Sequence, residues 1–167
     1  MTISIHVGDI TESADEAIVN SANTSLLAGG GVCGAIHAAA GPELEFACRR
    51  LGHCPTGEAV VTPAFNLKAK YVIHAVGPRW LDGTRGEREL LRRCYESIFI
   101  RVAEKGIRSV SIPSISTGIY HYPLESAARV AIDVARQHDA PDLAINFVCF
   151  SEEVARAYAK AVGSART

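Results

Sequence analysis

The sequence predicts an α/β fold in which helices cover both faces of a mainly parallel β-sheet. Short runs rich in β-branched residues alternate with longer segments whose apolar residues recur at helical spacing. This alternation is typical of strand–helix–strand units, whose crossovers place helices on the faces of the sheet. No repeat or low-complexity tract interrupts the 167 residues. We therefore expect a single domain spanning residues 1–167.

The first half of the chain is expected to contribute four strands and two helices. Alternating or β-branched runs predict strands at 3–7, 16–20, 58–63 and 70–76. Apolar spacing predicts one helix from Gly31 to Ala40. A second helix begins at Pro42 and ends at Gly52, because proline suits the first turn of a helix and glycine its C-terminal cap.

The second half begins with a long predicted helix from Glu87 to Gly106, where glycine ends it. Its apolar residues recur at helical spacing: Leu90, Leu91, Cys94, Ile98, Val102 and Ala103. The remaining predictions are a buried strand at 109–115, a helix from Pro123 to Arg136, and a strand at 143–150. Ser151 is expected to cap the N-terminus of the last helix.

Composition excludes several classes of protein. The chain is 48% hydrophobic and 21% charged, which is ordinary for a soluble globular domain and not for a disordered one. Its net charge of -1 argues against nucleic-acid binding through bulk electrostatics, since such domains carry a basic face. No run reaches the about 18 apolar residues of a membrane span, and no secretory signal opens the chain. Membrane partners are therefore not expected.

The cysteines indicate a reducing compartment. There are five of them (33, 48, 54, 94 and 149), an odd number without a CxxC pair. Together with the missing signal, this favours free thiols and a cytoplasmic location. A zinc cluster would require cysteines in tighter paired spacing, so no metal site is expected. No other cofactor is expected either.

A glycine-rich loop precedes the predicted helix at residue 31, in the stretch AGGGVCG (28–34). Three consecutive glycines let backbone N–H groups approach a ligand closely, and the helix directs its positive dipole end to the same place. A phosphate or diphosphate suits such a loop, and a flexible turn is the alternative. The Walker and Rossmann glycine patterns are both absent.

A second loop, SISTGIYHYP (114–123), follows the predicted strand at 109–115. Its hydroxyl residues and glycine can form another backbone cradle, at the strand ends where such sheets bind ligands. Asp9 follows the first strand, where it can accept from an amine such as that of adenine or cap the next turn. Asn20 and Asn23 flank the end of the second strand, where amides suit a ribose or a turn. Two such loops predict a diphosphate-bridged ligand.

Several blocks of the chain together resemble the macrodomain family, in its MacroD-type branch. They are GDIT (8–11), IVNSANTSLLAGGGVCGAIHAAAG (18–41), CPTGEAV (54–60), YVIHAVGPRW (71–80) and PSISTGIYHYPLE (113–125). The resemblance implies a three-layer α/β/α sandwich with a mixed, mainly parallel central sheet that binds ADP-ribose. Members of this branch remove mono-ADP-ribose from acidic side chains and deacetylate O-acetyl-ADP-ribose.

The resemblance also assigns ligand-binding roles. Asp9 would bind the adenine amine with Ile10 beside it, and Phe150 would flank the ring by aromatic contact. Asn23 would bind the distal ribose, and Tyr120 would close over it. Two groups of residues would hold the diphosphate: Gly29, Gly30, Gly31 and Val32 in the first loop, and Ser116, Thr117, Gly118, Ile119 and Tyr120 in the second.

Three positions depart from the pattern of the branch, which usually reads GGGGVDGAIH where this chain reads AGGGVCGAIH. Ala28 replaces a glycine, and His121 replaces the commoner glycine of the second loop. Cys33 replaces the aspartate that the branch uses to position or activate the attacking water. The candidate catalytic residues are accordingly Cys33, Asn23, Tyr120 and His121.

Several readings of the site remain open. In a hydrolase of variant mechanism, the ligand's own phosphate orients the water, and His121 is either an acid–base group or an exposed loop residue. A Cys33–His37 nucleophilic pair is another possibility, because the two lie one helical turn apart. A reader module without turnover and an ADP-ribose 1″-phosphate phosphatase are the alternatives. The expected partner is ADP-ribose or an ADP-ribosylated protein, bound by a monomer.

Overall fold

A computed structural model describes residues 2–138 and 140–164 of the chain. The strands are β1 (Thr2–Val7), β2 (Ala17–Ser21), β3 (Ala59–Pro63), β4 (Tyr71–Ala75), β5 (Ser109–Ile112) and β6 (Ala144–Cys149). The helices are α1 (Gly31–Ala40), α2 (Pro42–Leu51), α3 (Glu87–Lys105), α4 (Leu124–Gln137) and α5 (Glu152–Gly163), with a short 3-10 helix, η1, at Ile10–Glu12.

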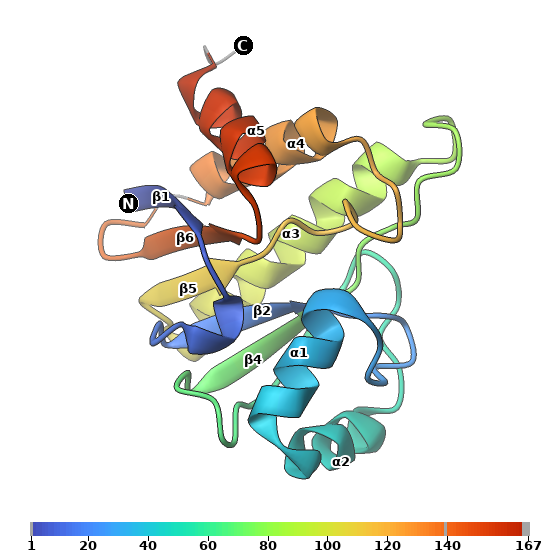
Figure 1. The fold of residues 1–167 in the computed structure, drawn as a ribbon, viewed down its shortest axis with the longest axis vertical. Coiled ribbons are helices and arrows are strands. Elements are labelled where there is room, and N and C mark those ends of the chain that lie inside the picture. Colours follow the sequence, from blue (N-terminus) through green and yellow to red (C-terminus); the bar gives the residue numbers. More distant parts are fainter. Residues whose placement is uncertain (1, 139, 165–167) are drawn as a thin grey trace.

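The strands form one sheet in the order β1-β6-β5-β2-β4-β3 (Figure 1). Neighbouring strands are parallel except at one edge, where β3 pairs antiparallel with β4. The sheet is therefore mixed and mainly parallel, as predicted. Strands β2 and β5 are adjacent at its centre although a long stretch of sequence separates them.

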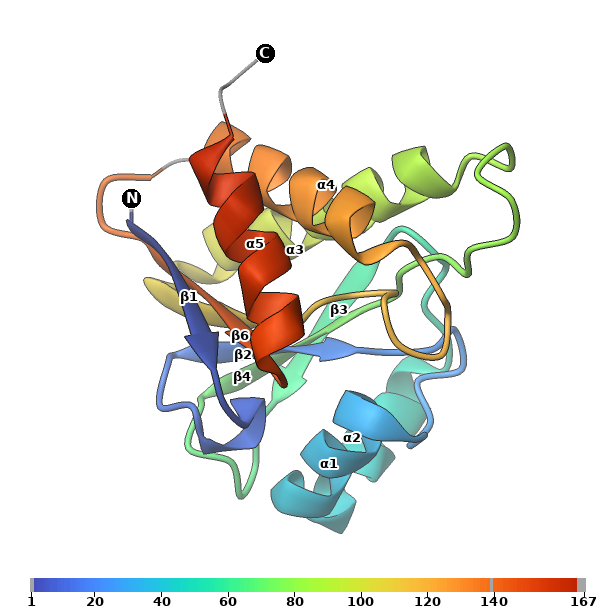
Figure 2. The same ribbon diagram turned by 45° about the horizontal axis from the view of Figure 1, so that its top comes forward.

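Helices α1 and α2 cover one face of the sheet (Figures 1 and 2). Ile18 of β2 and Val72 of β4 are buried against Ile36 of α1 and Leu44 of α2. Burying each of these side chains contributes roughly 2 kcal/mol. This layer carries the glycine-rich loop, because that loop joins β2 to α1.

Helices α3, α4 and α5 cover the opposite face (Figure 2). Val19 of β2 and Ile73 of β4 point to this side, and they share a core with Ile98 of α3 and Val134 of α4. Alternation along β2 thus supplies both cores, since side chains of a strand point alternately to opposite faces. The predicted three-layer α/β/α sandwich is confirmed.

Local signals placed most element ends to within one residue. Helix α1 spans the predicted residues, and α2 runs from Pro42 to a cap at Gly52. Gly106 ends α3 in the left-handed conformation, with φ 64°. Ser151 caps α5 by accepting a hydrogen bond from the N–H of Val154 at 3.3 Å.

The largest difference from the predicted boundaries is at β5, and the other boundaries that differ shift by one residue. The strand expected at 109–115 ends at Ile112, because Pro113 has no N–H to continue the ladder. The helix expected to begin at Pro123 begins at Leu124, with Pro123 in the cap position. Within the ranges 2–138 and 140–164, no helix is long and apolar enough to cross a membrane.

A polar cluster is buried beneath α1 and α2, around His74 of β4. The Asn20 side-chain amide lies 3.1 Å from Nδ1 of His74, and Thr62 Oγ1 lies 2.9 Å from its Nε2. Donation by Asn20 leaves the proton on Nε2, which then donates to Thr62. Burial, with a smaller effect of His37, lowers the pKa of His74 from 6.5 to about 3. The imidazole therefore stays neutral in the fold.

His74 is expected to make the protein acid-sensitive. Between pH 6.5 and about 3 the unfolded chain binds a proton that folded His74 does not, so stability falls as the pH falls, by about 1.4 kcal/mol per pH unit in this window. His37 acts in the same direction, because burial also lowers its pKa. His74→Gln is expected to be less stable at pH 7 but to lose less on acidification.

Urea unfolding at pH 7 and pH 5 measures both effects. The exposed His53 provides the control, and His53→Gln is expected to follow the wild type. Equal losses on acidification in His74→Gln and wild type would show that His74 is not the source.

Candidate functional site

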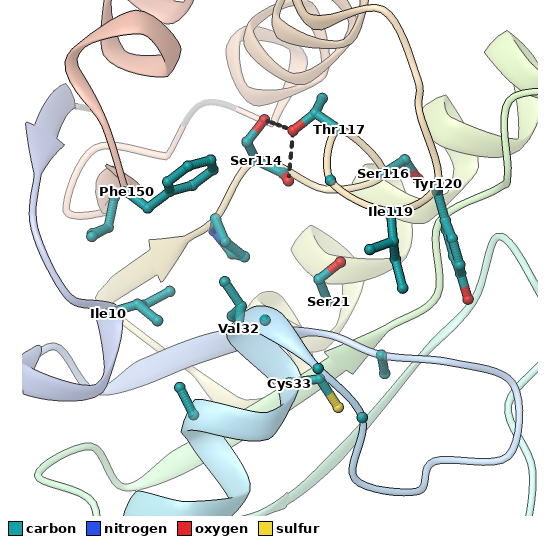
Figure 3. Close-up of a pocket in the computed structure, with 18 of the residues that line it drawn as sticks. Ile10, Ser21, Val32, Cys33, Ser114, Ser116, Thr117, Ile119, Tyr120 and Phe150 are labelled. Atoms are coloured by element: carbon teal, nitrogen blue, oxygen red, sulfur yellow. Dashed lines mark hydrogen bonds between the residues drawn. The ribbon is translucent and has the colours of Figure 1, made fainter.

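A pocket of about 570 Å³ opens at the carboxyl ends of the central strands (Figure 3). The segments after β1, β2, β5 and β6 line it, so four elements far apart in the sequence contribute to one cavity. Its size falls within the range of roughly 300–1,000 Å³ for small-molecule sites. Asp9 is the only Asp, Glu, Lys or Arg among its lining residues.

The glycine-rich loop and the N-terminus of α1 form one wall. Gly29, Gly30, Gly31 and Val32 all line the pocket. Gly34 lies directly behind this wall: a Cβ there would come within 2.3 Å of the Gly29 carbonyl oxygen. The loop therefore folds onto its own helix, whose positive end faces the cavity. This geometry suits an anion.

The loop after β5 forms the facing wall. Ser116, Thr117, Gly118, Ile119 and Tyr120 all line the pocket. Ser116 is left-handed, with φ 67°, and its carbonyl accepts from the N–H of Tyr122 at 2.9 Å. Its Oγ is buried and has no hydrogen-bond partner among the described residues. The loop is thus preformed around an unpaired hydroxyl.

Gly77 packs closely against this second loop. A Cβ at Gly77 would lie 2.2 Å from Ser116 Oγ and 2.5 Å from Ile115 Cγ2. Sequence reasoning did not single out Gly77 or Gly34, because both stand in segments predicted as ordinary structure. The contact with Ser116 and Ile115, which are distant in the sequence, explains why Gly77 lacks a side chain, and the fold of the loop onto α1 explains Gly34.

Ile10 and Phe150 lie at one end of the pocket (Figure 3), and Asp9, which precedes Ile10 in the chain, also lines it. Asp9 caps η1, accepting with Oδ1 from the Thr11 N–H at 2.9 Å and from Thr11 Oγ1 at 2.7 Å. These hydrogen bonds lower the pKa of Asp9. Asp9 can therefore cap η1 and also accept from an amine such as that of adenine, because the cap uses only Oδ1 and leaves Oδ2 free. Phe150 is 72% exposed and lies on the same side as Ile10 in Figure 3, leaving an aromatic face uncovered.

Cys33 and Asn23 lie at another part of the pocket and share one acceptor. The Asn23 side-chain amide donates to the Leu27 carbonyl at 2.9 Å, and the Cys33 thiol donates to the same oxygen at 3.5 Å. The amide of Asn20 donates to Cys33 Sγ at 3.8 Å. The thiol is therefore held between a carbonyl and an amide at the pocket wall.

The structure does not pair Cys33 with His37. His37 is buried on α1, and neither ring nitrogen has a hydrogen-bond partner among the described residues. Burial lowers the pKa of His37, which disfavours the cation that an activated thiolate pair requires. The contacts of Cys33 are instead Leu27 and Asn20.

Tyr120 and His121 are placed differently although they are neighbours. Tyr120 lines the pocket, and the Arg79 guanidinium lies 5.0 Å from the centre of its ring. His121 is exposed, has φ 60°, and is not among the lining residues. This position corresponds to the reading of His121 as an exposed loop residue.

Over the part of the chain that the structure describes, no group of three His, Cys, Asp or Glu side chains is arranged to hold a metal ion. All five cysteines are free thiols and are buried. Burial raises the pKa of Cys48, Cys54 and Cys149 to about 11, so these three stay protonated at neutral pH.

Comparisons with known proteins point to one family. A Macro domain family model matches residues 19–131. O-acetyl-ADP-ribose deacetylase 1 of Pantoea vagans is 51% identical over 158 residues, 90% of this chain and 92% of the relative. Macro domain-containing protein CT2219 of Chlorobaculum tepidum is 51% identical over 159 residues, 93% of this chain and 92% of the relative.

Solved structures agree. The Oceanobacillus iheyensis macrodomain with ADP superposes with a TM-score of 0.90 and 42% identity, covering 95% of this chain and 88% of that one. The Trypanosoma brucei macrodomain in complex with ADP-ribose gives a TM-score of 0.89 and 39% identity, covering 96% of this chain and 69% of that one.

Gly77→Ala is expected to destabilise the protein by about 1–3 kcal/mol, because the added methyl group must displace Ser116 and Ile115. Gly163→Ala is the matched control. Its Cβ would meet nothing within 4 Å at the end of α5, so stability should be unchanged or slightly raised. Urea unfolding compares the two, and equal stability would contradict the close packing at Gly77.

Proposed function

This chain belongs to the Macro domain family, and from that premise we propose that it binds ADP-ribose in the pocket and hydrolyses ADP-ribosyl esters there. The observation that carries the proposal is the pair of facing loops, which lie between the end with Ile10 and Phe150 and the part with Asn23 and Cys33. We further propose that residues 1–167 act as one monomeric domain.

The proposed binding mode uses backbone more than side chains. The adenine ring would lie against Phe150, and its amino group would donate to the free Oδ2 of Asp9. The diphosphate would lie between the two loops and accept from their N–H groups. Asn23 and Tyr120 would contact the distal ribose, whose C1″ carries the modification. A cavity whose lining holds a single carboxylate and no cation suits hydrogen bonding to phosphate by neutral groups.

In the proposed reaction, water attacks C1″ and breaks its bond to the carboxylate oxygen of the modified side chain. The side chain leaves as a free carboxylate, and a phosphate oxygen of the ligand accepts the proton of the water. Since residue 33 supplies no carboxylate, the protein contributes positioning by the two loops and Tyr120. Relatives named O-acetyl-ADP-ribose deacetylase support an ester as the substrate.

One observation favours a second function, a reader that binds ADP-ribose without turnover. Cys33 stands where the MacroD-type pattern has an aspartate, and its thiol is already engaged with Leu27 and Asn20. A panel of ADP-ribosylated glutamate, O-acetyl-ADP-ribose and ADP-ribose 1″-phosphate separates the reader from the hydrolase and from a phosphatase.

Asp9→Asn is expected to weaken ADP-ribose binding about tenfold in calorimetry. The amide retains an oxygen to cap η1 but turns the second acceptor into a donor, which opposes the adenine amine. Exposed Asp142 gives the control, and Asp142→Asn should bind like the wild type. Unchanged affinity in Asp9→Asn would place the adenine elsewhere.

Wild type is expected to release ADP-ribose from a glutamate-modified protein, and Cys33→Ala to retain that activity, because positioning supplies the rate. Cys33→Asp should be faster, since a carboxylate can accept the proton of the water. Chromatography of released ADP-ribose measures all three. If wild type binds ADP-ribose but is inert while Cys33→Asp is active, the protein is a reader.

A further inference from the structure

A chain of hydroxyl groups connects the core to the second loop. It begins at Tyr95 of α3 and Tyr158 of α5, both 0% exposed, whose hydroxyl oxygens are 3.4 Å apart. Tyr158 donates to Ser114 Oγ at 3.0 Å. Ser114 Oγ lies 2.7 Å from Thr117 Oγ1, and both residues line the pocket (Figure 3). The chain thus ends at the cavity.

The donor and the acceptor of each hydrogen bond in this series of hydroxyl groups can be assigned. Tyr158 gives its proton to Ser114, so the Tyr95 hydroxyl must be the donor to Tyr158. Thr117 Oγ1 donates to the Ser114 carbonyl at 3.2 Å, so Ser114 Oγ donates to Thr117. Every hydroxyl therefore donates once, and protons run one way from Tyr95 to the loop.

The backbone of the loop joins the same chain. The N–H of Ile115 donates to the Tyr95 hydroxyl oxygen at 3.2 Å. Strand β5 has ended at Ile112, and Pro113 has no N–H, so the sheet does not hold Ile115. The Tyr95 hydroxyl therefore binds the backbone beyond the end of the β5 ladder, at the residue before the left-handed Ser116.

Packing alone does not require these hydroxyls. Phenylalanine would fill nearly the same volume, whereas a buried hydroxyl costs free energy unless it is hydrogen-bonded. Two such groups, from helices on the face opposite α1, meet at a single loop. Burial raises the pKa of Tyr158 to about 12 and that of Tyr95 well above its usual value, so both protons are present at neutral pH.

We propose that Tyr95 and Tyr158 are positioning residues, which hold Ser114, Ile115 and Thr117 so that the second loop presents its N–H groups to the diphosphate of the ligand. This proposal rests on the proposed binding of ADP-ribose. It assigns a functional role to two core residues of α3 and α5 that do not line the pocket.

The test replaces each tyrosine by phenylalanine, which preserves the core. Tyr158→Phe and Tyr95→Phe are expected to weaken binding of ADP-ribose and ADP about five- to tenfold in calorimetry, the loss of one ordered hydrogen-bond chain. Adenosine, which lacks the diphosphate, should bind equally to both variants and wild type in NMR titrations. Tyr71→Phe, a hydroxyl deletion on β4 away from the pocket, is the control and should bind all three ligands normally.

A double-mutant cycle provides a second readout. Ser114→Ala cuts the chain at its next member, so Ser114→Ala combined with Tyr158→Phe should lose no more affinity for ADP than Ser114→Ala alone. Fully additive losses would overturn the proposal. Equal losses for adenosine and ADP would also overturn it, because the hydroxyls would then serve only general packing.

Hydrogen exchange of the free protein separates failure of this proposal from failure of the proposed function. Tyr95→Phe should speed exchange of the Ile115 amide roughly tenfold, while amides of β2 stay protected. If wild type binds no ADP-ribose, the proposed function fails, and this exchange still decides whether the tyrosines hold the loop. Unchanged exchange in both variants would overturn the positioning role.

Discussion

The site depends on the pairing of β2 with β5 at the centre of the sheet. Among the described residues, the ladder joins only Ala17 to Val110 and Ile18 to Ser111, near the starts of both strands. Beyond it, the chain leaves β2 for α1 on one face and leaves β5 for α4 on the other. Neighbouring parallel strands whose connections diverge leave a crevice at their carboxyl ends. Both loops border that crevice, so the pairing sets the distance between them.

The two loops are held in shape by different means. The first is held locally, since it folds onto α1 with Gly29 packed against Gly34, and the helix itself supplies the positive end. The second is held from other parts of the fold, by the close packing of Gly77 and by the Tyr95 hydroxyl. The residues that hold the first loop lie within a short stretch of sequence. Those that hold the second loop lie far from it in the sequence, after β4 and in α3.

This difference explains how much the sequence could predict. Pro42, Gly52, Gly106 and Ser151 act within a few residues, so helix ends followed from local chemistry. The pocket-lining loops followed from glycine and hydroxyl content together with the family resemblance. Contacts such as Tyr95 with Tyr158, which are 63 residues apart, have no local signal, because each looks like an ordinary apolar position of a helix. The early end of β5 follows from Pro113, which the apolar run around it obscured.

Position 33 shows that a departure from a family pattern is also a structural change. The thiol donates to the Leu27 carbonyl, the same oxygen that fixes the Asn23 amide. A carboxylate has no proton to donate, so at this place it would set a negative oxygen against the carbonyl oxygen. It would have to turn toward the Asn20 amide or into the cavity, and Leu27 would keep Asn23 as its remaining side-chain donor. The Cys33 thiol therefore connects the start of α1 to Leu27, whose carbonyl also binds Asn23. The residue that removes the carboxylate of the family pattern thus adds this hydrogen bond.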